Sequence, residues 1–238
     1  MQQADFEKAR KAEASYHDEL YSEKEILEPG SWMSKPVPVV MEMLERLLRF
    51  KSRLEVLDLG CGAGRNAIPV ALRLRHTGST VTGLDLLEEA VEKLQENAQK
   101  YKVEDMIRVE KGDAEHTPLS DGNYDYMIAC GCLEHVSSEQ AFIKVLERMK
   151  AGTAPGGIHC ITMNTGIEEI EADSDRKLKP LIELNLPTDR ALTLFRQAYK
   201  DWNVLKQSTV LQSIPEEKYD KPTQFRACSV IFAAQKTG

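Results

Sequence analysis

Residues 56–71 read VLDLGCGAGRNAIPVA, an apolar run that ends in an aspartate and is followed by glycines at positions 60, 62 and 64. A segment such as Leu54–Leu59, which has branched apolar residues on both of its faces, is typical of a strand inside a parallel sheet. Glycines directly after such a strand let the backbone approach a ligand closely and adopt positive φ. In open parallel sheets, ligands bind where the strands end. This stretch therefore predicts a ligand site at the end of the first strand.

A strand-and-helix alternation continues from this point along the chain. Further short apolar strands are expected at 80–84, 107–111, 126–130 and 158–163, and helical segments are expected at roughly 64–76, 87–101 and 138–150. The spacers are long enough for crossovers, and right-handed crossovers leave few topologies to consider. The pattern predicts an α/β fold, a three-layer sandwich with a mostly parallel sheet and helices on both faces.

The two ends of the chain depart from this alternation. Residues 4–28 predict one or two polar helices that Pro29-Gly30 ends, and 37–50 has apolar residues at helical spacing. A helix is expected at 188–200, followed by strands Asn203–Leu211 and Arg226–Ala233, so the last strand runs antiparallel to the one before it. We expect a helical cap segment at 1–36 and a main domain at 37–238. Within it, 166–187 is interpreted as a lid, and GIEEIEADSD (166–175) as a solvated acidic loop.

Bulk composition excludes several classes of protein. The net charge of -7 argues against non-specific binding to nucleic acid. Five cysteines without a CxxC pair make a disulfide framework or a zinc site unexpected, and we expect no metal site. The N-terminus has no apolar core and so does not read as a signal peptide, and no apolar stretch reaches spanning length. A cytoplasmic location is the expectation.

Asp58 distinguishes between the two ligand families that use a glycine turn of this kind. A dinucleotide site needs GxGxxG, with the pyrophosphate at the helix N-terminus. Here the third glycine comes one residue early, at 64, and the carboxylate of Asp58, two residues before Gly60, would repel a phosphate. The same carboxylate suits an ammonium group. These residues favour S-adenosylmethionine, which has an α-amino group and no phosphate.

Acidic residues recur at the next strand ends, where they suit other parts of S-adenosylmethionine. Asp85 can accept hydrogen bonds from two ribose hydroxyls, and Asp113 from the adenine amino group. The backbone at Cys130 is expected beside the methionine part. Structural alternatives remain for each aspartate: a helix N-cap for Asp58, a cap for the helix near Leu87 for Asp85, and an Asx-turn for Asp113.

Residues 56–163 resemble a class I, Rossmann-like methyltransferase. The resemblance rests on DLGCGAGRN, the strand-end Asp85, GDAEHTPL and the APGG before the fifth strand, and the antiparallel tail matches too. It implies a seven-stranded sheet with a reversed last strand. It also implies that the cofactor is held by Asp58, Gly60, Gly62, Asp85, Leu86, Asp113 and Ala114.

A narrower similarity points to the tellurite-resistance methyltransferase family. It is carried by LGCGAGRNA, the YKDW that ends the tail helix, and the closing FRACSVIFAAQK. This similarity implies tellurium or selenium oxyanions, or thiols, as methyl acceptors. The segment ACGCLEHV departs from that family and is of the generic small-molecule type.

Further residues flank the expected site. Arg65 and Asn66 lie at the start of the first expected helix. They either face solvent, or they contact the cofactor and help to close the turn. Trp32 either packs the cap segment against the domain or covers the cofactor. His135 is the candidate general base, with a backbone hydrogen bond as its structural alternative. The full set of expected cofactor-binding residues is Asp58, Gly60, Cys61, Gly62, Arg65, Asn66, Asp85, Leu86, Asp113, Ala114, Cys130 and Trp32.

The sequence thus predicts an enzyme that moves a methyl group from S-adenosylmethionine to a small molecule by in-line displacement. The alternatives are methylation of tellurite, selenite or a thiol, a nicotinamide-dependent oxidoreductase, and a non-catalytic protein that binds S-adenosylmethionine. We expect a monomer or homodimer with a small-molecule partner and no nucleic-acid or membrane partner.

Overall fold

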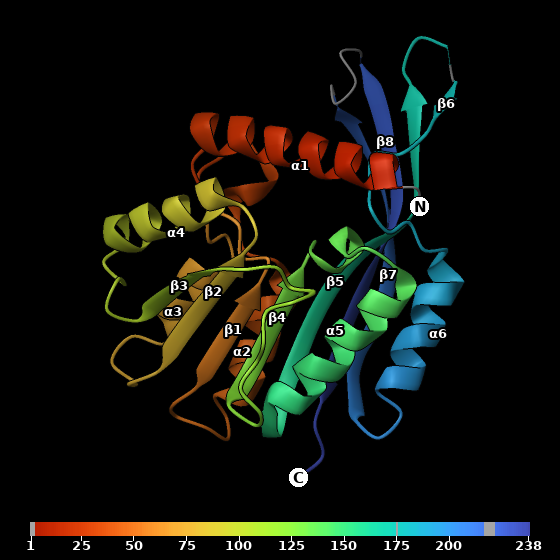
Figure 1. Cartoon of the computed structure of the whole chain (residues 1–238). Coiled ribbons are helices and arrows are strands. Elements are labelled where there is room, and N and C mark those ends of the chain that lie inside the picture. The colour runs from red at the N-terminus through yellow and green to blue at the C-terminus, as the bar shows by residue number, and fades with distance from the viewer. Residues whose placement is uncertain (1–2, 175, 217–221) are drawn as a thin grey trace.

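The computed structural model describes residues 3–174, 176–216 and 222–238. Position 175 of the acidic run and most of the loop between the last two strands lie outside the described residues. The chain forms one mixed sheet with helices on both faces (Figure 1). Within the described ranges, no helix is both long and apolar enough to cross a bilayer.

The sheet has strand order β3-β2-β1-β4-β5-β8-β7. Strands β1 to β5 are parallel, and β8 is antiparallel to both β5 and β7. The bounds are β1 Glu55–Leu59, β2 Thr80–Asp85, β3 Ile107–Lys111, β4 Tyr124–Cys130, β5 Thr153–Glu171, β7 Asn203–Glu216 and β8 Thr223–Gln235. The expected mostly parallel sheet with a reversed last strand is confirmed. One short strand was not expected: β6 (Lys177–Leu178) pairs with the end of β5 and makes an eighth strand.

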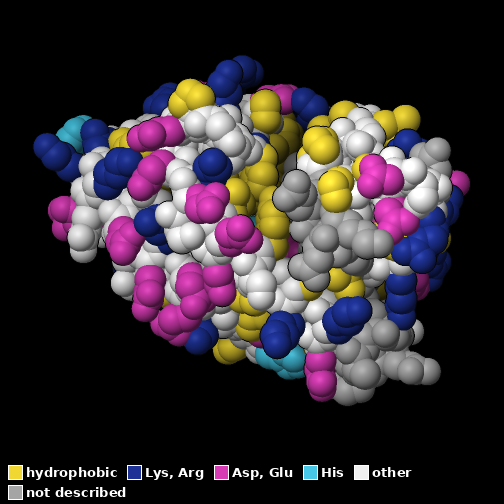
Figure 2. Space-filling model, turned by 90° about the horizontal axis from the view of Figure 1, so that it is seen from above, with side chains coloured by type: hydrophobic (Ala, Val, Ile, Leu, Met, Phe, Trp, Pro, Cys, Tyr) yellow, Lys and Arg dark blue, Asp and Glu magenta, His cyan; other side chains and the backbone are white. Residues whose placement is uncertain are grey.

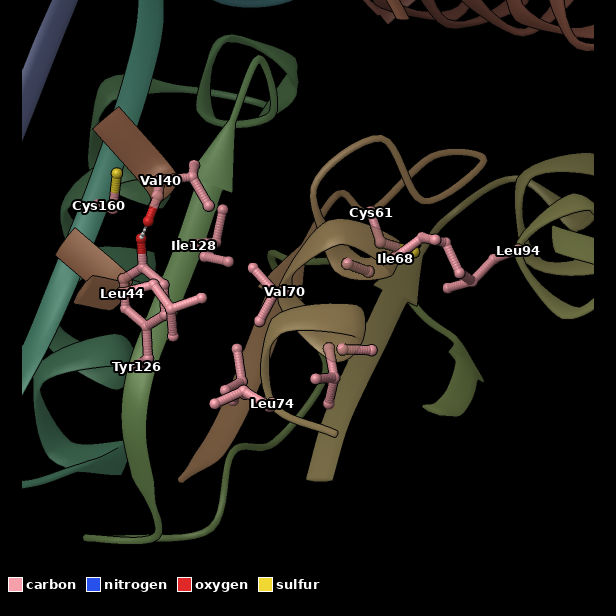
Figure 3. Packing of buried hydrophobic residues seen from close by; sticks show 14 of the residues in the cluster. Val40, Leu44, Cys61, Ile68, Val70, Leu74, Leu94, Tyr126, Ile128 and Cys160 are labelled. Carbon is pink, nitrogen blue, oxygen red and sulfur yellow. Dashed lines mark hydrogen bonds between the residues drawn. The ribbon is translucent and has the colours of Figure 1, made fainter. Parts of the chain in front are cut away.

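The helices form two layers that bury separate cores. Helices α2 (Pro38–Leu47), α3 (Ala67–Arg73) and α4 (Glu88–Lys100) contribute to the first core, and α5 (Glu139–Gly152) and α6 (Thr188–Ala198) to the second. In the first core, Tyr126 of β4 donates its hydroxyl to the Val40 carbonyl of α2 at 2.8 Å (Figure 3). A buried tyrosine whose hydroxyl is satisfied in this way fixes α2 against the centre of the sheet.

The N-terminal segment lies across the top of this sandwich. Helix α1 (Gln3–Glu23) is a single helix, and Figure 1 shows it crossing above the ends of the strands towards the extension formed by β5 and β8. A short 3₁₀ turn, η1 (Trp32–Ser34), follows it. A second 3₁₀ turn, η2 (Leu133–His135), follows β4 on the same side. The elements above the strand ends therefore come from segments far apart in sequence.

The interpretation of GIEEIEADSD as a solvated loop was wrong for its first half. Residues 166–171 continue β5, because β8 goes on pairing with β5 from Glu168↔Arg226 to Glu171↔Thr223 after a register shift. Glu169 and Glu171 are buried there. The expected lid at 166–187 therefore begins inside the sheet.

At the opposite end of the sheet, His159 of β5 is fully buried in a polar network. One ring nitrogen lies 2.6 Å from the Thr153 hydroxyl, and the other lies 2.7 Å from the Tyr199 hydroxyl. Burial, together with the smaller effects of the nearby Lys236 and Lys150, lowers the pKa of His159 to about 3 against an opposing hydrogen-bond contribution. This histidine is neutral in the folded protein.

We predict that His159 makes the protein acid-sensitive. Because the unfolded chain binds the proton near pH 6.5 and the folded chain does not, the contribution of His159 to the unfolding free energy falls as pH drops below 6.5, by about 2 kcal/mol at pH 5. Denaturant midpoints at pH 7.5 and pH 5, compared between wild type and variant, measure this contribution. His159→Gln should remove it, so that its stability at pH 5 relative to pH 7.5 exceeds that of wild type, whereas His76→Asn, at an exposed loop position, should not change this comparison. An equal pH difference in wild type and His159→Gln would contradict the prediction.

Candidate cofactor and acceptor site

The glycine turn lies where the strand order reverses. From β1 the chain proceeds through β2 and β3 on one side and then returns to β4 on the other. In open parallel sheets, such a reversal is the usual ligand position, and here it lies between the ends of β1 and β4. Gly60 has φ +71°, and a Cβ added there would lie 2.6 Å from the Cβ of Cys132, beyond the end of β4. Only glycine allows the two loops to lie so close.

Asp85, at the end of β2, holds this turn in place. Its Oδ2 accepts a hydrogen bond from the Gly62 amide at 2.8 Å, and its Oδ1 accepts one from the Leu87 amide at 3.0 Å. Asp85 therefore does support the start of α4, as the structural alternative proposed, and it also connects the ends of β1 and β2. Each oxygen keeps a further lone pair for a ligand hydroxyl.

Asp58 is buried inside β1, with 1% of its surface exposed. Both carboxylate oxygens lack a hydrogen-bond partner among the described residues. Burial and the nearby charge of Asp85 raise the pKa of Asp58 to about 8, against a smaller opposing effect of the Ala67 amide. A buried carboxyl without a partner is costly. The site therefore favours a cationic ligand group that would satisfy Asp58.

Asp113 follows β3 at the same edge. Its Oδ1 accepts from the Glu115 amide at 2.7 Å, which is the Asx-turn that was the structural alternative. Its Oδ2 lies 3.7 Å from Arg10 of α1. The carbonyl of Ala114 accepts from Arg148 at 2.6 Å, and Leu86 is 37% exposed after the end of β2. Leu86, Asp113 and Ala114 thus follow neighbouring strands, as expected.

Trp32, Arg65 and Asn66 bring the cap segment to the start of α3. The Arg65 guanidinium lies 5.1 Å from the Trp32 ring centroid and donates to the Lys35 carbonyl at 2.6 Å. Asn66 is buried, and its side-chain oxygen accepts from the Val37 amide at 3.0 Å. These contacts give Arg65 and Asn66 a defined role in anchoring the N-terminal segment. Their contact with a cofactor, and that of Trp32, stays a prediction.

The Cys61 and Cys132 thiols beside the glycine turn are neutral. Burial raises the pKa of Cys61 and of Cys132 well above the usual value, and the charge of Asp85 adds to both shifts. Cys130 is half-buried at the end of β4. Neutral, buried thiols pack as small apolar groups and are poor nucleophiles.

Helix α1 supplies contacts that the sequence did not indicate. The Tyr21 hydroxyl lies 2.6 Å from where a Cβ on Gly62 would stand, so α1 rests directly on the glycine turn. Arg10 donates to the His135 carbonyl at 3.0 Å and pairs with Glu183, its Nε lying 2.9 Å from Oε1. A polar N-terminal helix gave no sign of these partners, because they come from three distant segments.

His135 lies in an acidic environment. Its Nδ1 is 2.8 Å from Oε2 of Glu183, and its Nε2 is 3.6 Å from Oε1 of Glu13 in α1. Burial lowers the pKa of His135, but the Glu183 hydrogen bond and the charges of Glu13 and Glu134 outweigh this effect and raise the pKa to about 9. The imidazole is therefore protonated at neutral pH. A role as general base would require the contacts with Glu183 and Glu13 to loosen.

Glu134 precedes His135 and is buried, with 2% of its surface exposed. Its Oε1 accepts from the Asn164 amide of β5 at 3.0 Å, and its Oε2 is buried without a hydrogen-bond partner among the described residues. Burial raises the pKa of this carboxyl. Sequence reasoning assigned no chemistry to Glu134.

Comparison with known proteins agrees with this geometry. A family model described as a methyltransferase domain matches residues 56–157. Norajmaline N-methyltransferase of Rauvolfia serpentina is 28% identical over 152 residues, which are 59% of this chain and 51% of that protein. The 27-O-demethylrifamycin SV methyltransferase of Amycolatopsis mediterranei (strain S699) is 28% identical over 146 residues, again 59% and 51%. The chain spans about half the length of these curated relatives.

Solved structures show the same fold. TehB from Haemophilus influenzae has a TM-score of 0.57 at 21% identity, covering 82% of this chain and 62% of that one. The [4+2]-cyclase SpnF has a TM-score of 0.61 at 17% identity, and the match covers 97% of this chain and 94% of that one. The sheet order agrees with the class I, Rossmann-like methyltransferase fold of these structures. Residues 56–157 of this chain therefore match a methyltransferase domain, within a sheet of the same fold.

Proposed function

We propose that this protein transfers a methyl group from S-adenosylmethionine to a small-molecule acceptor. The observation that carries the proposal is the buried carboxyl of Asp58, which has no partner among the described residues and lies beside a second carboxylate, Asp85. Two acidic groups at neighbouring strand ends attract a ligand ammonium and repel a pyrophosphate. This charge arrangement argues against a nicotinamide dinucleotide.

The residues present fit the parts of S-adenosylmethionine. Asp58 would hold the α-amino group, and Asp85 would accept from the ribose hydroxyls with its remaining lone pairs. Asp113, Ala114 and Leu86 would form the adenine end. The expected contacts at the methionine end and the turn are Gly60, Cys61, Gly62, Arg65, Asn66, Cys130 and Trp32.

The protein's own contribution to the reaction is to position groups and exclude water. When bound, S-adenosylmethionine supplies a methyl group already activated by a sulfonium. Tyr21 and Arg10 hold α1 over the strand ends, which keeps solvent from the glycine turn. Holding two reactants in line can supply up to roughly 7–11 kcal/mol of the barrier reduction. No nucleophilic residue is required for such a displacement.

The class of acceptor is supported by surface shape and by the relatives. Seen from the α1 side, a hollow with hydrophobic side chains runs between the main body and the extension of long strands (Figure 2). Concave, mostly apolar sites suit small organic molecules. The relatives named above are an N-methyltransferase and a methyltransferase of a rifamycin.

Two alternatives keep specific support. The fold likeness to TehB accompanies the sequence similarity that suggested tellurite, selenite or thiol methylation. The likeness to a cyclase shows that this fold also occurs in a protein named for another reaction, so a non-methylating role has structural precedent. Release of S-adenosylhomocysteine, screened with organic acceptors, thiols and tellurite, separates them. Tight S-adenosylmethionine binding without release from any acceptor would favour the non-catalytic alternative.

The first prediction here is that S-adenosylmethionine binding at pH 7 releases a proton. With a pKa of about 8, about nine in ten Asp58 carboxyls are protonated at pH 7, and an ammonium favours the ionised form. Affinity should rise from pH 6 to pH 8, and calorimetry in two buffers of different ionisation enthalpy should show different heats. Asp58→Asn should abolish the buffer dependence and weaken binding roughly tenfold or more. The exposed Asp105→Asn is the control. Identical heats in both buffers for wild type would count against the assignment.

The second prediction concerns α1. Arg10→Ala removes the ion pair with Glu183 and the hydrogen bond to the His135 carbonyl, so α1 should detach more often. Hydrogen exchange of the amides of residues 3–23 should be faster than in wild type, and bound S-adenosylhomocysteine should dissociate faster. Lys11→Ala, at an exposed position on the same helix, should leave both rates unchanged. Unaltered exchange in Arg10→Ala would show that other contacts hold α1.

A further inference from the structure

Glu134 carries a polar atom that the fold itself does not use. One carboxylate oxygen accepts from the Asn164 amide, which connects η2 to β5, whereas the other is buried without a partner among the described residues. Burying an ionisable group in this way is costly unless something pairs with it. Among the described residues, this oxygen therefore has a place left for a hydrogen-bond donor.

The cations near Glu134 are engaged with other carboxylates. Arg10 pairs with Glu183 and faces Asp113, and His135 lies between Glu183 and Glu13. The charge of His135 lowers the pKa of Glu134, but burial raises it by more, and the charge of Glu13 also raises it. Glu13 also pairs with His17 at 3.0 Å, so the cations of this cluster are engaged with Glu13, Glu183 and Asp113, and among the described residues none forms an ion pair with Glu134.

Glu134 lies between the cofactor residues and α1. Its charge, together with those of Asp85, Asp58 and Asp113, raises the pKa of the Cys132 thiol next to the glycine turn. On its other side it interacts with Glu13 of α1. The hydrophobic hollow of Figure 2 opens on the face that α1 covers. The turn η2 that carries Glu134 contacts α1 through the hydrogen bond from Arg10 to the His135 carbonyl, so Glu134 lies on the same side of the molecule as this hollow.

We propose that the methyl acceptor is a small amine with an apolar body, and that the unpartnered Oε2 of Glu134 binds its ammonium group. The inference rests on the proposed methyl transfer and names its acceptor class. A charge-assisted hydrogen bond from an ammonium both satisfies the oxygen and gives Glu134 the cationic partner that the described residues do not supply. A neutral alcohol satisfies the oxygen but supplies no charge.

The transfer balances with these groups alone. One ammonium proton moves to Oε2 of Glu134, and the freed nitrogen lone pair forms the new N–C bond to the methyl carbon. The C–S bond of the donor breaks at the same time, and its electron pair stays on sulfur, which becomes a neutral thioether. The product amine carries the positive charge that the sulfonium lost, and no oxidant or further reactant takes part.

The test compares matched acceptors on the full chain. Apolar primary amines such as 2-phenylethylamine and cyclohexylmethylamine are each paired with the corresponding alcohol. Binding to the protein saturated with S-adenosylhomocysteine is measured by calorimetry, and turnover by S-adenosylhomocysteine release. We expect amines to bind more tightly than their alcohols, and turnover to occur with amines.

The matched variant is Glu134→Gln, which keeps the side-chain shape and removes the charge. It should weaken amine binding and raise KM roughly 10- to 100-fold, with little change for alcohols. Glu139→Gln, at the start of α5 and paired with Arg190, is the control and should change neither. Should Glu134→Gln not fold, the wild-type amine–alcohol comparison decides alone.

Two results would overturn the amine assignment. One is alcohols that bind as tightly as their amines to the wild-type complex, and the other is a folded Glu134→Gln protein with unchanged amine affinity. Neither result would contradict the proposed function, which is tested separately by S-adenosylmethionine binding and by methylation of any other acceptor. Loss of S-adenosylmethionine binding in wild type would instead remove the proposed function itself.

Discussion

The hydrogen bond between Asp85 and the Gly62 amide joins the ends of β1 and β2 and fixes the glycine turn between them. Because the turn is held there, the loop after β4 can approach Gly60, and Tyr21 of α1 can rest against Gly62. Asp58 is then enclosed, and its carboxyl has no partner from the described chain. One short contact between neighbouring strand ends thus determines where the unsatisfied carboxyl lies, the group that we propose binds the ammonium of the ligand.

Unsatisfied carboxyls occur at two levels of this site. Asp58 lies below the glycine turn, inside the sheet, and Glu134 lies beside it, on the turn that follows β4. Each is almost fully buried, and in each case burial is the main cause of a raised pKa. A folded protein tolerates such groups mainly at functional positions, because binding supplies the missing partner. The cofactor and the acceptor would then be recognised by the same kind of interaction, in which a buried acidic side chain pairs with a cationic group of the ligand.

Helix α1 and the extension of β5 and β8 add the contacts that surround the candidate site to a fold that many proteins share. The sheet and its covering helices are shared with structures at 21% identity or less, including one named as a cyclase. In this chain, Arg10, Glu13 and Tyr21 make contacts from one helix to η2, Glu183 and the glycine turn. Those contacts cover the strand ends and bring acidic groups to the acceptor side.

The sequence by itself determined the α/β architecture, the order of the central elements, the reversed last strand and the cluster of aspartates at the strand ends, because all of these follow from local periodicity and from residues adjacent to a strand. It did not determine the length of β5, since residues 166–171 become strand only through pairing with β8. Nor did it reveal that His135 is a cation held by Glu183 and Glu13, or that Glu134 is left without a partner. Such properties depend on distances between residues up to 122 positions apart in sequence, as for Glu13 and His135, and only the packing of the tertiary structure decides them.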